Sequence, residues 1–209
     1  MRMRERIAEG KLFLDNCQNL PKERLLAKSR MVEFNQSPPE AVEIRKALIK
    51  EILGTESTVL IEPPFYFCYG RNITFGAQVY VNMSCHFIDD GKISIGDQTM
   101  IGPNVTLVTV GHPFAPQLRK FMYTEPITIE ENCWIGANVT VLPGVTIGAN
   151  SVIGAGSVVT KSIPPNVIAL GNPCVCVRSI TEEDNHYYRK GMRITKEELK
   201  EIEVANQKG

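Results

Sequence analysis

The feature that most constrains this chain is a six-residue period in its second half. An aliphatic residue recurs at every sixth position, and a small residue follows four positions later. This period matches neither an α-helix, which repeats every 3.6 residues, nor a single strand, which alternates every two. It is typical of stacked short parallel strands and predicts a hexapeptide-repeat parallel β-helix. The aliphatic positions are Ile129, Ile135, Val141, Ile147, Ile153 and Val159.

Each part of the repeat has an expected place in such a coil. We expect the aliphatic side chain to fill the interior and the small residue to fit a crowded inside corner. A Gly directly follows the aliphatic residue in IGANVT, IGANSV and IGAGSV. We expect this Gly to relax the backbone at the turn, because glycine adopts conformations that other residues avoid.

The same pattern occurs earlier in the chain but out of phase. Ile95, Ile101 and Leu107 are six apart, whereas Ile95 and Ile129 are separated by 34 residues, which is not a multiple of six. A segment is therefore inserted, and we assign it to residues 110–126, which contain three prolines and one His. A long loop that leaves a rigid scaffold is usually functional or disordered, and we expect a function here.

Different sequence flanks the coil. Residues 1–60 are assigned to an N-terminal helical segment, since KERLLAKSRMVEFN and EAVEIRKALIKEILG carry apolar residues at helical spacing. The β-helix is assigned to 61–178, with clear repeats over about 73–163. Residues 179–209 form a C-terminal extension, in which Thr195 and Glu198 make a capping box before a short surface helix.

Composition narrows the functional classes. The 209 residues contain 23 Lys plus Arg and 23 Asp plus Glu, without a basic stripe, so nucleic-acid binding has little support. No stretch approaches the roughly 20 apolar residues of a membrane span, and the first residues lack a secretory signal pattern, so a cytoplasmic protein is expected. The six cysteines form no CxxC pair, which favours reduced thiols over disulfides or zinc.

His112 is the strongest candidate for chemistry. The chain has three histidines, of which His86 falls in a strand-like run and His186 in a polar helical stretch. His112 lies where the coil breaks off, and an imidazole can take a proton from a hydroxyl and return it to a leaving group. Glu125 and Asp90 are both candidates for orienting its ring. A zinc hydratase on a similar coil would need several histidine ligands, which three histidines do not supply convincingly.

Several longer motifs carry a resemblance to a known family. They include GKLFLDNCQNLPKERLLAK near the N-terminus, YVNMSCHFIDDGKISIGDQTMIGPNVTLVTVGHP, NCWIGANVTVLPGVTIGANSVIGAGSVVTKSIPPNVIALGNPC and the HYY tail. Over almost the whole chain the sequence resembles the galactoside acetyltransferases of the maltose/galactoside acetyltransferase family of hexapeptide-repeat acyltransferases. The HYY and FYFCYG segments favour the galactoside type over the maltose type.

The resemblance implies a left-handed β-helix that forms a homotrimer with sites between subunits. It implies transfer of acetyl from acetyl-CoA to a sugar hydroxyl, without a metal, with His112 as the general base of a direct transfer. Carried over by position, the acceptor-binding residues are Asp15, Arg24, Cys68, Tyr80, Asn82, Asp90 and Met122. Those for CoA are Asn82, Trp134, Ala137, Ala155, Thr160, Lys161 and Arg178, with backbone amides near Ala137 expected to hold the acetyl oxygen.

The chain departs from the family pattern at two positions. Cys68 replaces a serine, and a thiol is a poorer hydrogen-bond partner for a sugar. Val175 replaces an arginine, which leads to the hypothesis of weaker binding of the CoA nucleotide. Without the resemblance, Trp134 could be a packing residue and Asp89-Asp90-Gly91 a solvated turn.

Alternative functions stay open at this point. The acceptor could be maltose, glucose or a xenobiotic alcohol. A covalent route through Cys68 or Cys85 would give an acetyl-enzyme. The β-helix could also be a non-catalytic assembly module, because a scaffold alone does not determine a function.

Overall fold

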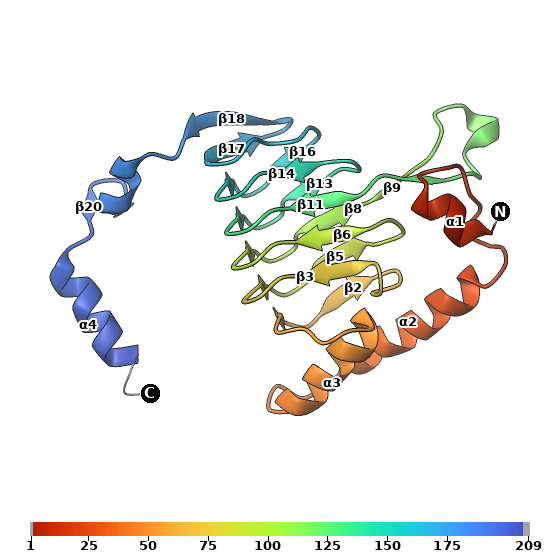
Figure 1. Cartoon of the computed structure of the whole chain (residues 1–209), viewed down its shortest axis with the longest axis horizontal. Coiled ribbons are helices and arrows are strands. Elements are labelled where there is room, and N and C mark those ends of the chain that lie inside the picture. Colours follow the sequence, from red (N-terminus) through yellow and green to blue (C-terminus); the bar gives the residue numbers. More distant parts are fainter. Residues whose placement is uncertain (1, 207–209) are drawn as a thin grey trace. The chain divides into compact units, whose positions relative to one another are not determined.

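The computed structural model describes residues 2–206, in two compact units. The first unit extends to Arg178 and the second begins at Ser179. The first contains three N-terminal helices followed by a stack of short strands (Figure 1). The helices are α1 (Met3–Ala8), α2 (Leu20–Asn35) and α3 (Val42–Leu53).

Three sheets form the faces of the stack, their strands pair in parallel from coil to coil, and strands β1 to β17 of the coils move from one sheet to the next. The seven-stranded sheet contains β1 (Leu60–Ile61), β4 (Tyr80–Val81), β7 (Met100–Ile101), β12 (Trp134–Ile135), β15 (Val152–Ile153), β17 (Val167–Gly171) and β18 (Cys174–Ser179). The five-stranded sheet contains β2 (Phe65–Phe67), β5 (Cys85–Ile88), β8 (Thr106–Val108), β13 (Thr140–Val141) and β16 (Val158–Val159). The four-stranded sheet contains β3 (Ile73–Phe75), β6 (Ile93–Ile95), β11 (Ile127–Ile129) and β14 (Thr146–Ile147). The predicted parallel β-helix is confirmed.

The interior is built from rows of side chains that stack from coil to coil. In the seven-stranded sheet the row contains Ile61, Val81, Ile101, Ile135, Ile153 and Ala169, all of them buried. The outward neighbours of this row alternate with it along each two-residue strand, as the period of two in a strand requires. The aliphatic positions of the hexad are therefore the interior positions, as predicted.

The first coils are wider than the last. Tyr80 pairs with Met100, twenty positions on, whereas Trp134 pairs with Val152, eighteen positions on. The interior of the early coils holds aromatic rings, and Phe65 and Phe87 meet edge to face with their centroids 5.0 Å apart. The two extra residues of an early coil lie at one corner, because Phe87 and Ile95 are eight positions apart, whereas Ile95, Ile101 and Leu107 keep the six-residue spacing. The unbroken six-residue period is therefore longest in the second half of the sequence.

The expected role of the repeat glycine was wrong. The left-handed position of each corner lies three residues after the aliphatic residue, and Asn138 and Asn150 hold it with φ of 58° and 60°. Gly136 instead meets the next coil, where an added Cβ would lie 2.6 Å from the backbone nitrogen of Ala155. Asn tolerates the left-handed region better than most residues, so glycine remains free for the place where two backbones approach.

The inserted segment is a hairpin that leaves the stack without interrupting it. Ile129 pairs directly with Ile95, and Val141 with Leu107, so the coils on either side of the insertion stay in register. Strands β9 (Val110–Gly111) and β10 (Tyr123–Thr124) pair in antiparallel fashion, and the short helix η1 (Pro116–Leu118) lies between them. Figure 1 shows this hairpin extending beside α1.

The second unit contains little buried surface among its described residues. It consists of η2 (Glu182–His186), the hairpin of β19 (Tyr187–Arg189) and β20 (Met192–Arg193), and α4 (Lys196–Asn206). The predicted capping box is present, since the Glu198 N–H donates to Thr195 Oγ1 over 3.2 Å and the Thr195 N–H donates to Glu198. No helix within residues 2–206 is both long and apolar enough to cross a membrane.

Two glycine substitutions test why the corners have this sequence. We expect Gly136→Ala to lower the free energy of unfolding by about 1 to 3 kcal/mol, because its Cβ would collide with backbone that cannot rotate away. Gly156→Asn is the matched control, since Gly156 has open space and occupies with φ of 73° the corner position that Asn takes elsewhere. Denaturant unfolding at one protein concentration would measure both, and equal losses would contradict the explanation.

Candidate active site

Corners of successive coils lie over one another where the hairpin leaves the stack. We call this column the loop corner; it comprises residues 68–72, 89–92, 109–126, 142–145 and 160–162, between the five- and four-stranded sheets. One hydrogen bond connects two of its levels, since the Gly91 N–H donates to Thr109 Oγ1 over 2.8 Å. Another closes the base of the hairpin, since the Glu125 N–H donates to the Thr109 carbonyl over 2.9 Å. Residues from separate coils are therefore held at the base of the hairpin.

His112 follows β9 on the hairpin and its side chain is exposed. Its Nδ1 lies 2.7 Å from the carbonyl oxygen of Arg119 and 3.0 Å from that of Phe121. A carbonyl oxygen can only accept a hydrogen bond, so Nδ1 must carry the proton. In the neutral ring, Nε2 then holds the lone pair and can accept a proton from a substrate.

The group that orients His112 is thus the backbone of its own hairpin. The two carboxylates considered from the sequence lie elsewhere in the loop corner. The Glu125 side chain covers Gly144, where an added Cβ would be 2.8 Å from Glu125 Oε2. Asp90 lies on the coil below, where its side chain hydrogen-bonds the Cys68 thiol.

The Asp89-Asp90 pair is buried, so the solvated-turn interpretation was wrong. Asp90 is 4% exposed, and burial raises its pKa above the ordinary value, while the Cys68 thiol and the charge of Arg24 act in the opposite direction. A buried carboxyl group is suited to binding hydroxyl donors. This places two of the predicted acceptor residues, Cys68 and Asp90, in direct contact.

Asp89 organises the turn that presents Cys68. It is fully buried, and its Oδ1 accepts hydrogen bonds of 2.8 Å from both the Cys68 and the Tyr69 N–H groups. The other oxygen, Oδ2, is buried and accepts no hydrogen bond from residues 2–206. Burial raises the pKa of Asp89 to about 7, because the two backbone donors only partly offset the loss of solvent.

The N-terminal segment adds Arg24 and Asp15 to this group. Arg24 Nη1 donates to the Asp15 carbonyl over 2.8 Å and to the Tyr69 hydroxyl over 2.9 Å. A second guanidinium nitrogen lies 3.4 Å from the Asp15 carboxylate. Tyr69 therefore links the turn fixed by Asp89 to helix α2, and the structure brings Asp15, Arg24, Cys68 and Asp90 together as the resemblance implied.

Met122 joins the same group from the hairpin. A buried apolar cluster comprises Ile7, Phe13, Leu20 and Tyr69, and Met122 packs against it together with Cys68 and Val110. A cavity of about 580 Å³ also opens beside Asp90, between α1 and the loop corner. Of the predicted acceptor residues, Asp90 alone lines this cavity, which therefore adjoins the group described here through that residue.

Tyr80 and Asn82 do not lie in the loop corner. Asn82 belongs to the corner between the seven- and five-stranded sheets, which we call the Asn82 corner and which comprises residues 62–64, 82–84, 102–105, 136–139 and 154–157. Ala137 and Ala155, predicted to bind CoA, occupy later levels of this corner. Tyr80 and Trp134 both pair with Met100 in the adjacent sheet, and Trp134 is 55% exposed, so it does not pack in the core.

The remaining candidates for CoA are divided between corner and sheet. Thr160 and Lys161 follow β16 at the upper end of the loop corner, and Lys161 is exposed. Arg178 lies on β18, as does Val175, which is 58% exposed. One chain therefore carries the predicted site residues on two different corners, with His112 at one and Asn82 at the other.

The cysteines proposed for a covalent route are poorly suited to it. Burial raises the pKa of Cys68 to about 12 and that of Cys85 to about 11. Since the thiolate is the nucleophile, neither side chain is activated at neutral pH. All six cysteines are free, and within residues 2–206 no three His, Cys, Asp or Glu side chains are gathered as a metal site.

Sequence reasoning missed several residues that shape the site. Asp89 could have been suspected from its position beside Asp90, but nothing in the sequence distinguished a buried carboxyl from an exposed one. The Arg119 and Phe121 carbonyls left no signal, because a backbone group has the same chemistry at every position. Thr124 also gave none, and the FYFCYG segment, although noted, gave no sign that Tyr69 contacts Arg24, since both partners come from distant segments.

Comparisons with known proteins agree with this architecture. The family description "Bacterial transferase hexapeptide (six repeats)" matches residues 126–161, and "Maltose acetyltransferase hexapeptide capping motif" matches residues 6–56. The fold and the loop corner thus define a hexapeptide-repeat acyltransferase with an N-terminal capping segment.

Relatives that match almost the whole chain narrow the family to which it is assigned. The galactoside O-acetyltransferase of Escherichia coli (strain K12) is 52% identical over 197 residues, which cover 93% of this chain and 97% of the relative. A solved galactoside acetyltransferase in complex with coenzyme A has a TM-score of 0.87 and 52% identity, covering 93% of this chain and 99% of that one. A maltose O-acetyltransferase from Clostridium difficile 630 has a TM-score of 0.85 and 40% identity over 87% and 99%. The chain belongs to the maltose/galactoside acetyltransferase family, and the possibility of a non-catalytic module was wrong.

The buried Asp89 should make stability depend on pH. Its pKa is raised in the folded protein to about 7, above the ordinary value of about 4, so over this interval the folded chain binds a proton more tightly than the unfolded chain. Its contribution is therefore present at low pH and lost as the pH rises from about 4 to 7, by at most about 1.4 kcal/mol per pH unit. We expect Asp89→Asn to remove this slope.

Urea unfolding of wild type and Asp89→Asn between pH 4 and 8 would measure the effect. Asp97→Asn is the matched control, because Asp97 is an exposed corner residue whose Oδ1 accepts one backbone hydrogen bond, from the Ala77 N–H over 2.8 Å. Parallel pH profiles for wild type and Asp89→Asn would show that burial does not hold the proton on Asp89.

Proposed function

We propose that this chain transfers acetyl from acetyl-CoA to a hydroxyl of a galactoside or a related glycoside. The observation that carries the proposal is the pair of carbonyl contacts that place the proton of His112 on Nδ1. This arrangement leaves Nε2 as the base, on an exposed hairpin above a buried carboxylate. The similarity to galactoside acetyltransferases over more than nine-tenths of the chain supports the choice of substrates.

The proposed reaction is a direct transfer. Nε2 of His112 accepts the proton of the acceptor hydroxyl while the hydroxyl oxygen attacks the thioester carbonyl carbon. The carbonyls of Arg119 and Phe121 stabilise the imidazolium that forms, since their hydrogen bond to Nδ1–H strengthens when the ring becomes charged. The tetrahedral intermediate then loses the CoA sulfur as its carbon–sulfur bond breaks, and the sulfur takes the proton from Nε2. Backbone amides near Ala137 are proposed to stabilise the oxyanion.

The loop corner is proposed to bind the acceptor. Asp90 of this corner, with Asp15 and Arg24 of the adjoining N-terminal segment, offers hydrogen-bonding groups that can fix sugar hydroxyls in defined orientations. The Cys68 thiol already hydrogen-bonds the Asp90 side chain. We therefore propose that Cys68 acts mainly on Asp90, and that the sugar contact made by serine in relatives is weaker here.

The two corners of one chain supply complementary halves of the site. The loop corner supplies His112, Cys68, Asp90 and Met122, and the N-terminal segment adds Asp15 and Arg24. We propose that a neighbouring copy supplies Asn82 from its Asn82 corner and Tyr80 from the adjacent strand β4. The exposed Trp134, with Ala137 and Ala155 beside it, is proposed to bind CoA together with Thr160, Lys161 and Arg178. A cyclic homotrimer is the smallest symmetric assembly that gives each copy two different neighbours. A cytoplasmic location is part of the same proposal, since acetyl-CoA is the co-substrate.

A maltose or glucose acceptor is the second candidate. The capping motif and the 40% identity to a maltose O-acetyltransferase favour it. The rate of CoA thiol release with a panel of galactosides, glucosides, maltose and simple alcohols separates the two.

His112→Ala tests the proposed base. We expect turnover to fall by about 100-fold or more, with acetyl-CoA binding retained, because the imidazole acts on the acceptor and not on the nucleotide. His86→Ala is the matched control, since His86 stacks on Tyr66 on the outer face of the coil. Thiol release and calorimetric CoA titration are the measurements. Comparable turnover in the two variants would refute the role of His112, and failure of wild type on every sugar would refute the acceptor class.

Mixed trimers test the shared site. We expect His112→Ala and Asn82→Ala to be inactive alone, whereas coexpression in equal amounts restores about a quarter of wild-type activity. A quarter is expected because a site works only when the first copy has an intact His112 and its neighbour an intact Asn82. Sedimentation of the purified protein provides the assembly size, and a monomer, or mixtures without activity, would contradict the model.

A further inference from the structure

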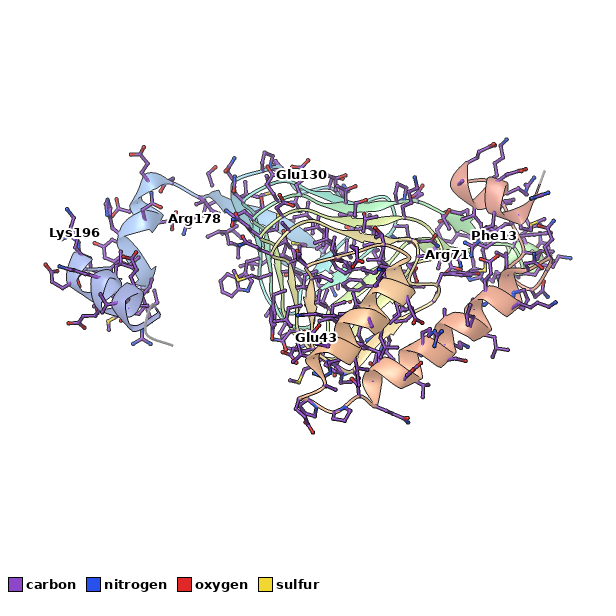
Figure 2. All side chains as sticks on the ribbon, turned by 60° about the horizontal axis from the view of Figure 1, so that its bottom comes forward. Phe13, Glu43, Arg71, Glu130, Arg178 and Lys196 are labelled. Atoms are coloured by element: carbon purple, nitrogen blue, oxygen red, sulfur yellow. The ribbon has the colours of Figure 1, made fainter. Side chains whose placement is uncertain are left out.

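The N-terminal segment is attached directly to the hairpin that carries His112. The Phe13 N–H donates to the Met122 carbonyl over 2.9 Å, and the Met122 N–H donates back to the Phe13 carbonyl over 3.0 Å. The two residues thus form an isolated antiparallel bridge. Figure 2 shows the labelled Phe13 beside the ribbon of α1. The bridge joins segments that are more than one hundred residues apart in the sequence.

A second attachment lies two residues further along the hairpin. Thr124 Oγ1 donates over 2.9 Å to the carbonyl of Ile7, in the last turn of α1, and Thr124 is 4% exposed. A buried hydrogen bond is strong and specific, because loss of one partner leaves the other polar group with neither a protein partner nor water to bond to. Together the bridge and the Thr124 bond hold strand β10 against residues 7–13.

Apolar packing reinforces both attachments. Phe13 is 1% exposed and belongs to the cluster with Ile7, Leu20 and Tyr69, against which Val110 and Met122 pack. Val110 and Met122 come from opposite sides of the hairpin, so the cluster holds both of them. The Phe13 ring therefore anchors the base of the hairpin to the N-terminal segment.

The attachments lie next to the contacts of the proposed base. The carbonyl of Phe121 accepts the Nδ1 hydrogen bond of His112 over 3.0 Å, and Phe121 immediately precedes Met122. On the other side of the bridge, Phe13 lies two residues before Asp15, which pairs with Arg24. A continuous path of hydrogen bonds and peptide links thus connects the acceptor residues to the imidazole.

We propose that Phe13 and Thr124 are positioning residues for acyl transfer, which fasten the His112 hairpin to the N-terminal segment that carries Asp15 and Arg24. The inference rests on the proposed function, because positioning has meaning only if His112 acts on an acceptor bound by those residues. Its consequence is that the capping segment sets the rate of transfer as well as completing the fold. Misplacement of a reacting group by about 1 Å can lower a rate by about 100-fold, so a loosened hairpin should be measurable.

The test uses substitutions that change one hydroxyl. We expect Thr124→Val to lower kcat by about 10-fold or more, with the KM for acetyl-CoA unchanged, and Thr124→Ser to restore kcat because it keeps the donor to Ile7. Thr99→Val is the matched control. Thr99 is fully buried in another corner, where its hydroxyl donates to the Glu130 carbonyl and accepts from the Cys133 N–H, so this change also removes buried hydrogen bonds.

A spectroscopic measurement separates positioning from a general loss of stability. The chain has three histidines, so the Nδ1–H resonance of His112 can be followed after nitrogen-15 labelling of histidine. We expect this resonance to be protected from solvent exchange in wild type, Thr124→Ser and Thr99→Val, and to exchange faster in Thr124→Val. Circular dichroism of each variant confirms folding at the assay temperature.

The outcomes are distinguishable from failure of the proposed function. If wild type transfers acetyl and His112→Ala does not, but Thr124→Val retains the kcat of Thr99→Val, the positioning role is wrong and the function stands. The same conclusion follows if Thr124→Ser fails to restore kcat. If His112→Ala is as active as wild type, the proposed base itself is wrong, whatever Thr124 does.

Discussion

Everything in this molecule depends on the close, in-register stacking of one coil on the next. The backbone of each corner approaches the backbone above it so tightly that a Cβ on Gly136 would lie 2.6 Å from the next coil. This contact fixes the position of each level, and so each corner becomes a column in which residues from separate coils meet. It also explains why the repeat has glycine where two coils touch and asparagine where the backbone adopts the left-handed conformation.

The loop corner turns this regular stacking into a site. Asp89 and Asp90 would be an ordinary turn in a free coil, but the coils above and below, with the N-terminal helices, bury them. Burial allows one carboxyl to hold two amide groups of the preceding coil, and it brings the other against Cys68. The charge of Arg24 is held nearby through Tyr69. Buried polar side chains therefore lie beside the hairpin, and the backbone carbonyls of the hairpin set the tautomer of His112.

The N-terminal segment holds the hairpin in place by contacts that add to its two covalent connections to the coil. A hairpin of two-residue strands has few hydrogen bonds of its own, and isolated hairpins are marginally stable in water. The bridge to Phe13, the Thr124 bond and the shared apolar cluster supply what the hairpin lacks. In physical terms the helical cap and the His112 hairpin form one packed body, which is the basis for the proposal that the cap affects acetyl transfer.

The sequence by itself determined the coil, the existence of the insertion and the N-terminal helices, and it made His112 the candidate base. These features depend on side-chain periodicity and on local chemistry, which a linear pattern records directly. Even so, the six-residue period was unbroken only in the narrow coils, because the earlier coils have two extra residues at one corner, as between Phe87 and Ile95. The sequence also misassigned the role of Gly136 and left the orientation of His112 between two carboxylates.

Only the tertiary structure decided what each residue touches. The partners of His112 are backbone carbonyls, which leave no trace in a sequence, and the burial of Asp89 depends on neighbours contributed by other coils. His112 and Asn82 lie on two different corners because the chain turns from one sheet to the next within each coil, so that residues close in sequence lie on different faces. Periodicity is a local property and survives in the sequence, whereas contact between distant segments is created by folding and can be read only from the folded chain.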